Sequence, residues 1–159
     1  ERYADAEPLF LAMIAASDQN GDVTHHRMAL GFLYLLTEDY PRAERLFHEA
    51  LVFNEHARHW ARTATTYADL GLLAWLQGDI ATADLHVQRV ETMSARMDAL
   101  NPNFQALRWA VDARRGSPEA MAALDALRRE PGFGWGNREI AHTIIRRLER
   151  DGTLPPLSA

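Results

Sequence analysis

The sequence has 159 residues and a formal net charge of −5, and it contains no cysteine. This length corresponds to one domain, and the missing cysteines exclude a disulfide framework, a thiolate nucleophile and a zinc–thiolate site. The acidic balance disfavours nucleic acid as a partner, because nucleic-acid-binding domains carry a strongly basic footprint. The sequence shows no signal-peptide pattern and no apolar run long enough to span a bilayer, so we expect a cytoplasmic protein.

Apolar residues recur at helical spacing between short turn segments along the whole chain. Strand-like alternation is nearly absent, and Ala and Leu are abundant, so we predict an all-α fold. The first residues already read as the inside of a helix, which suggests a chain that begins part-way through a larger protein. The predicted helices cover residues 2–16, 23–37, 40–56, 60–77, 80–99, 102–115, 118–129 and 137–150. The segment 54–60 lacks Gly and Pro, so one long bent helix there also fits the pattern.

Three helical pairs carry small or apolar residues at the same internal offsets, with Arg108 in the third pair as the exception. The first pair has Leu30, Gly31, Tyr34, Ala43, Phe47 and Ala50. The second has Leu70, Gly71, Ala74, Ala83, Val87 and Val90, and the third has Leu107, Arg108, Val111, Ala120, Leu124 and Leu127. Small residues at the glycine and alanine positions let the two helices of a pair approach closely, and the large residue that follows fills the space to the next pair.

This pattern resembles the tetratricopeptide repeat, a helix–turn–helix unit with Leu-Gly in its first helix and Ala, Phe and Ala in its second. The resemblance covers about residues 2–130, although Arg108 stands where the third unit should have glycine. It implies a right-handed α-solenoid of about 3.5 hairpins with a C-terminal capping helix. The repeat domain would then span residues 1–150, followed by an extended tail at 151–159. An unrelated helical bundle is the alternative.

The resemblance also implies a concave surface that is lined by the first helix of each pair. Alignment to the family places eight candidate binding residues on that surface: Met28, Phe32, Leu35, Leu72, Trp75, Gln105, Trp109 and Asp112. Most are apolar or aromatic, which suits an amphipathic helix or another peptide of a partner protein. The Lys, Asn and Arg with which chaperone-binding members hold a C-terminal carboxylate are missing here. The alternative is that these aromatic residues are core, with the terminal helix folded into the groove.

We therefore predict a non-catalytic protein–protein interaction module without a cofactor. The spacing from Gly31 to Gly71 is 40 residues and from Gly71 to Arg108 is 37, both longer than the usual 34. Similar lengthened repeats occur in the helical arms of large bacterial transcription regulators, which makes such an arm our first expectation. The alternative is a domain that senses a small-molecule or peptide effector. The first half-repeat, at residues 2–16, could also pair with a second copy to form a homodimer.

A metal-binding or enzymatic role has one candidate group of residues. His56 and His59 lie three residues apart and would share a face of a continuous helix, where two imidazoles can bind zinc, copper or nickel. A third ligand is not evident, because Glu55 and His86 could join the two histidines only if the fold brings them close. No HExxH motif is present. We accordingly predict no metal site and no catalytic residue.

Overall fold

The computed structural model describes residues 3–17, 23–95, 102–130 and 139–154. These residues form eight helices and no strand. The helices are α1 (Tyr3–Ser17), α2 (Thr24–Leu36), α3 (Tyr40–His56), α4 (Trp60–Gln77), α5 (Ile80–Ser94), α6 (Pro102–Arg114), α7 (Pro118–Arg128) and α8 (Glu139–Arg150). Among them, none is both long and apolar enough to cross a membrane.

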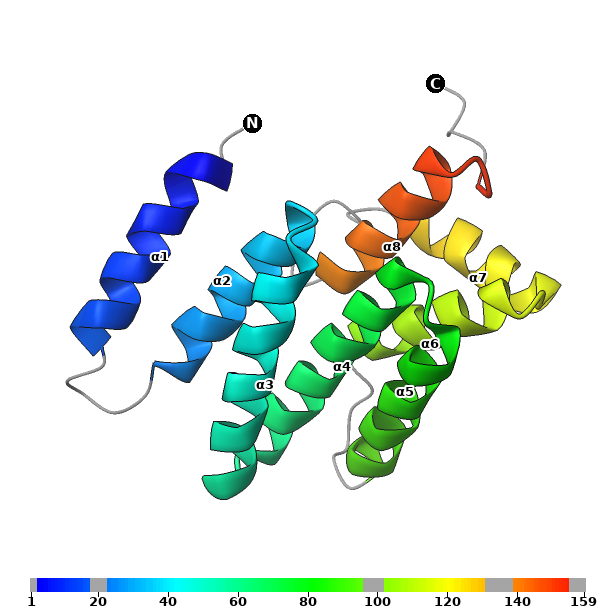
Figure 1. The fold of residues 1–159 in the computed structure, drawn as a ribbon. Coiled ribbons are helices and arrows are strands. Elements are labelled where there is room, and N and C mark those ends of the chain that lie inside the picture. The colour runs from blue at the N-terminus through cyan, green and yellow to red at the C-terminus, as the bar shows by residue number, and fades with distance from the viewer. Residues whose placement is uncertain (1–2, 18–22, 96–101, 131–138, 155–159) are drawn as a thin grey trace.

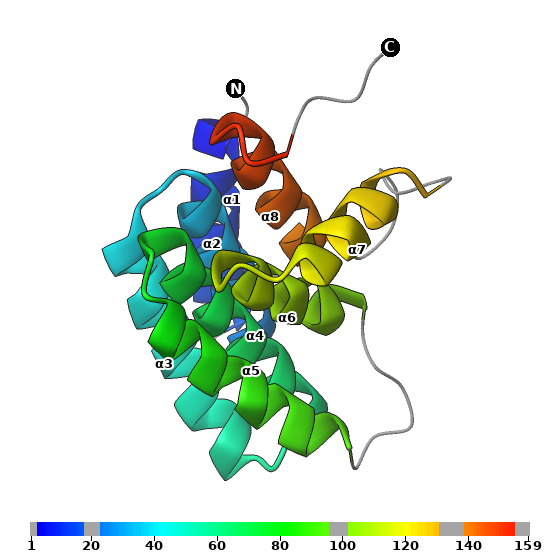
Figure 2. The same ribbon diagram turned by 90° about the vertical axis from the view of Figure 1, so that its right-hand side faces the viewer.

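The helices form a stack of antiparallel hairpins, α2–α3, α4–α5 and α6–α7, preceded by the single helix α1 (Figure 1). Each helix from α1 to α6 packs on the next one in the chain, and α4 also packs on α2 and α6. Figure 2 shows α3 and α5 together at one side of the stack, with α7 and α8 at the other. The prediction of an all-α solenoid with about 3.5 hairpins and a further C-terminal helix is confirmed.

Two helix boundaries settle points that the sequence left open. The backbone breaks between α3 and α4, where Arg58 has a positive φ of 54°, so the alternative of one long bent helix is wrong. α5 ends at Ser94, earlier than the predicted residue 99, and residues 96–99 lie outside the described part of the chain. At the C-terminus, packing continues beyond residue 150: Leu154 is buried and its N–H donates to the carbonyl of Leu148.

The second helix of each hairpin begins with the same type of cap. The side chains of Asp39, Asp79 and Ser117 accept hydrogen bonds from the backbone N–H three residues further on, at 3.3, 3.0 and 3.2 Å. Such a bond satisfies one of the free donors at a helix N-terminus. The repeated cap keeps the turn alike in all three hairpins.

Gly31 lets α2 and α3 approach closely. A Cβ added there would lie 2.7 Å from Cε1 of Phe47, closer than carbon atoms pack. The Phe47 ring is fully buried. In this hairpin, Gly31 and Phe47 therefore form one close contact.

We expect Gly31→Ala to destabilise the protein by about 1–3 kcal/mol, the usual cost of overpacking a core. At an unhindered helical site the same change stabilises by about 1 kcal/mol, so the sign of the effect reports the contact with Phe47. Urea denaturation followed by circular dichroism measures it. An increase in stability would show that the ring moves aside.

The third hairpin replaces this contact by ion pairs. Arg108, at the glycine position, donates to the carboxylate of Asp84 on α5, and its Nε lies 3.5 Å from Glu91. Arg115 donates to the other oxygen of Asp84 at 2.9 Å. Burial would raise the pKa of Asp84, but the hydrogen bond from Arg115 and the charges of both arginines outweigh it and lower the pKa. A paired arginine thus occupies the position where the other units need a glycine.

The C-terminal helix α8 lies against the first helices α4 and α6. Its apolar residues are all buried: Ile140, Ala141, Ile144, Ile145 and Leu148. Arg128 at the end of α7, whose side chain is 2% exposed, pairs with Asp125 at 2.5 Å and with Glu149 of α8 at 2.7 Å. The helix therefore covers the surface that the first helices of the hairpins would otherwise expose.

Candidate functional site

Three of the eight predicted binding residues lie in the core. Leu35 and Trp75 are 1% exposed and Leu72 is fully buried. The indole N–H of Trp75 donates to the carbonyl of Ala110 on α6 at 3.0 Å, so this tryptophan joins two repeats. All three residues are packed in the core, as in the alternative interpretation, and of the three only Leu35 also lies in the lining of the groove described below.

The other predicted residues differ in exposure and in their partners. Met28 is partly buried, and its sulfur accepts from the side chains of Asn54 and Thr66 at 3.9 and 3.6 Å. Trp109 is also partly buried and packs against the core. Gln105 is exposed, and Asp112 lies 3.8 Å from Arg108. The remaining residue, Phe32, is partly exposed and lines a groove.

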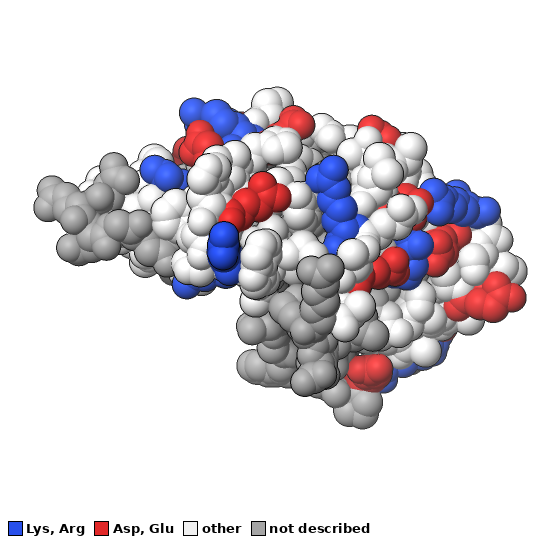
Figure 3. All heavy atoms as spheres, turned by 90° about the horizontal axis from the view of Figure 1, so that it is seen from below, with Lys and Arg blue, Asp and Glu red and all other residues white. Residues whose placement is uncertain are grey.

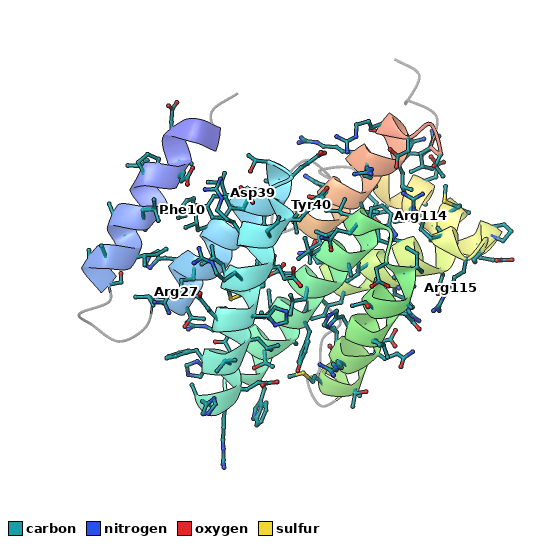
Figure 4. All side chains as sticks on the ribbon, viewed as in Figure 1. Phe10, Arg27, Asp39, Tyr40, Arg114 and Arg115 are labelled. Carbon is teal, nitrogen blue, oxygen red and sulfur yellow. The ribbon has the colours of Figure 1, made fainter. Side chains whose placement is uncertain are left out.

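That groove lies between α8 and the end of α2, and we call it the α2–α8 groove. It has a volume of about 300 Å³. Its apolar lining comes from the ends of α2 and α4 and from the start of α3: Phe32, Leu35, Leu36, Tyr40 and Leu76. Figure 4 labels Tyr40 at the start of α3, on the side that faces α8. The groove is the part of the first-helix surface that α8 leaves uncovered.

Arginines of α8 form the opposite wall of the α2–α8 groove. Arg147 pairs with Asp151 at 3.0 Å, and Arg150 pairs with Glu38 at 2.8 Å. Arg146 is exposed and has no ion-pair partner among the described residues. The lining thus holds three arginines against one glutamate, in a protein whose net charge is negative. The electrostatic potential in the groove is expected to favour an acidic ligand.

The sequence analysis did not assign these arginines to a site. A signal was present, because the apolar residues of α8 recur on one helical face, which leaves Arg146 and Arg150 together on the other face. That pattern predicts an amphipathic helix. It does not say which surface the helix covers. The opposite side of the groove comes from α2, which precedes α8 by about a hundred residues.

A second cavity, of about 460 Å³, lies near the opposite end of α4. We call it the Trp60 cavity. It is lined by the C-terminal ends of α3 and α5 and by the first half of α4, through Glu55, Trp60, Thr63, Tyr67, Arg89, Thr92 and Met93. Tyr67 donates to the carboxylate of Glu55 at 2.7 Å. Burial and this hydrogen bond raise the pKa of Tyr67, so the phenol remains a donor at neutral pH.

The histidines considered for metal binding are separated from other ligands. Nδ1 of His56 is 2.8 Å from the carbonyl of Val52, and the ring of His59 packs edge-on against Phe53. Within the described ranges, no group of three or more His, Asp or Glu could hold a metal ion. The break at Arg58 places His56 and His59 on different helical segments, the second as the residue before α4.

Charges of both signs alternate over the face that is seen from below in Figure 3. The blue side chains there are arginines, since the sequence has no lysine, and acidic side chains lie between them. Nucleic acid is usually bound by a patch or stripe of basic residues. This face has no such patch among its described residues.

The stacked hairpins and the surface of their first helices are the features of an α-solenoid repeat protein. Residues 22–95 match the sequence model of the tetratricopeptide repeat, and this part of the chain belongs to that family. Tetratricopeptide repeats generally mediate protein–protein interaction and are generally not catalytic. A search of curated proteins and a search of solved structures found no significant match. The matched segment covers α2 to α5 and ends before the hairpin in which Arg108 replaces glycine.

Proposed function

We propose that this protein is a protein–protein interaction module that binds an acidic amphipathic helix of its partner in the α2–α8 groove. The observation that carries the proposal is the pairing of an apolar floor with a wall of arginines on the first-helix surface. A helical segment laid into a groove is a common mode of peptide recognition. Phe32, Leu36 and Leu76 would receive its apolar side chains, and Arg146 would receive a carboxylate.

This proposal is tested by panning a library of displayed random peptides against the chain. We expect the selected peptides to carry apolar residues three or four positions apart together with Asp or Glu. Reversal of one charge, in Arg146→Glu, is expected to weaken these peptides about tenfold, since a charge-assisted hydrogen bond contributes roughly 1.5–3 kcal/mol. Titration calorimetry measures the change.

Arg45→Glu is the matched control. Arg45 is exposed on α3, lies outside the groove lining and has no ion-pair partner among the described residues. The control should keep the affinity of the parent chain while carrying the same change of net charge. Equal affinities of the parent and Arg146→Glu proteins would exclude the groove as the peptide site.

A finer part of the proposal is that the module is the arm of a larger bacterial regulatory protein. It is supported by the lengthened spacing of 40 residues between Gly31 and Gly71, a feature that resembles the arms of such regulators. In that setting, the groove would position the partner relative to the rest of the regulator.

The second candidate function is the sensing of a small-molecule effector. The Trp60 cavity favours it, because its volume of about 460 Å³ lies in the range of ligand pockets. It is lined by side chains of α3, α4 and α5, so a ligand there would contact two neighbouring hairpins. Binding could then change the angle between repeats.

A homodimer is proposed to form through α1. Leu9 and Met13 are 65% and 45% exposed, whereas Leu46 and Ala50, at the equivalent positions of α3, are 7% and 1% exposed. The difference arises because α3 packs on both α2 and α4, while α1 packs mainly on α2 and meets α3 through the ion pair of Glu7 with Arg42. A second copy could cover this apolar face of α1.

A further inference from the structure

The Trp60 cavity lies far from the α2–α8 groove. The α2–α8 groove includes Leu76, near the C-terminal end of α4, whereas the Trp60 cavity begins at the first residue of α4. A helix rises about 1.5 Å per residue, so about 24 Å separates these two positions, and about 14 Å separates Tyr67 and Leu76, the nearest lining residues of the two sites on α4. A ligand in one site would not touch the other.

One side of the Trp60 cavity suits a flat aromatic ring. Trp60 is 57% exposed, an unusual position for the largest side chain. Met93 is partly buried on the cavity wall, and its thioether is a favourable neighbour for an aromatic ring. Aromatic side chains such as Trp60 and Tyr67 pair with other rings in offset or edge-on geometry. An inserted ring would therefore gain contacts on several sides.

The polar side of the Trp60 cavity suits an anion. The guanidinium of Arg89 lies over the ring of Tyr67, 5.1 Å from its centroid, and has no carboxylate partner among the described residues. Glu55, the acidic residue of the lining, accepts the hydrogen bond from Tyr67. With Glu55 engaged in this way, Arg89 is the charged group that can donate to a ligand, and guanidinium binds carboxylates in a two-pronged geometry.

We propose that the Trp60 cavity binds a planar aromatic molecule that carries a carboxylate. Its ring packs against Trp60 and Met93, and its carboxylate accepts hydrogen bonds from Arg89. This inference names the ligand class for the second candidate function, on which it rests, and it is independent of peptide binding in the α2–α8 groove.

The test uses 2-naphthoate as the probe and the neutral 2-naphthamide as its matched control, both titrated into the full chain by calorimetry. We expect saturable binding of 2-naphthoate at one site, weakened about tenfold or more in Arg89→Gln and in Trp60→Ala. The amide should bind the parent protein more weakly than 2-naphthoate, and Arg89→Gln should not weaken it further. Both side chains are exposed, so we expect each variant to keep the fold, which circular dichroism checks.

Arg45→Gln, which removes a charge outside both sites, should leave 2-naphthoate binding unchanged. Arg146→Glu should also leave it unchanged, so the outcome is separate from that of the groove experiment. Absence of saturable binding, or equal affinity in the parent and Arg89→Gln proteins, would overturn the proposal. If Arg146→Glu loses peptide binding and the parent protein does not bind 2-naphthoate, the protein is a peptide-binding module and the proposed effector site is wrong.

Discussion

Replacement of Trp75 by alanine is expected to lower the free energy of unfolding by about 3–5 kcal/mol, the usual cost of deleting a buried aromatic side chain. The indole is 1% exposed, and its N–H donates to the carbonyl of Ala110 on the next first helix. Arg114 also lies over its ring, 5.0 Å from the centroid. The substitution leaves a cavity between α4 and α6 and removes the indole hydrogen bond that joins these two helices. Urea denaturation followed by circular dichroism at 222 nm measures the loss.

Trp60→Ala is the control for this experiment, since it removes the same side chain from an exposed position on the same helix. It should change stability by no more than about 0.5 kcal/mol. Similar losses in the two variants would contradict the placement of Trp75 as the link between repeats. In binding studies, a Trp75 variant would lose affinity because it loses stability. Arg146 is therefore the better position for a substitution that probes the groove.

Ile144→Ala is expected to destabilise the whole protein by about 2–5 kcal/mol. Ile144 is fully buried where α8 packs against α4 and α6. If α8 is part of the cooperative core, a cavity under it lowers the stability of all the helices together. We therefore expect one unfolding transition, shifted to lower urea concentration, by circular dichroism and by tryptophan fluorescence alike.

Arg146→Ala serves as the matched control on the same helix, because its side chain is exposed and has no ion-pair partner among the described residues. It should leave the midpoint almost unchanged. An unchanged midpoint in Ile144→Ala would instead indicate that α8 opens separately from the stack. In that case the α2–α8 groove would not be a fixed feature, because α8 supplies its arginine wall.

The sequence determined the class of fold and the positions of the helices. Helical spacing of apolar residues and local breakers are short-range signals, and they located eight helices. Their ends agree with the structure to within two residues, except that α5 ends at Ser94 and not at residue 99. The close approach of the two helices at Gly31 was predicted for the same reason, whereas the contact of Gly31 with Phe47 of its own hairpin was not, because the large residue was expected to face the next pair. The break at Arg58 was not, since it has no Gly or Pro to mark it.

Only the tertiary structure decided which residues form a surface. Packing between repeats buries Leu35, Leu72 and Trp75, and the position of α8 brings Arg146 and Arg150 to the same groove as Phe32. An amphipathic pattern states that one face of a helix will be buried, but the identity of the covering surface depends on contacts between residues about a hundred positions apart. The groove arises from such a long-range contact, and for that physical reason the repeat pattern alone could not predict its residues.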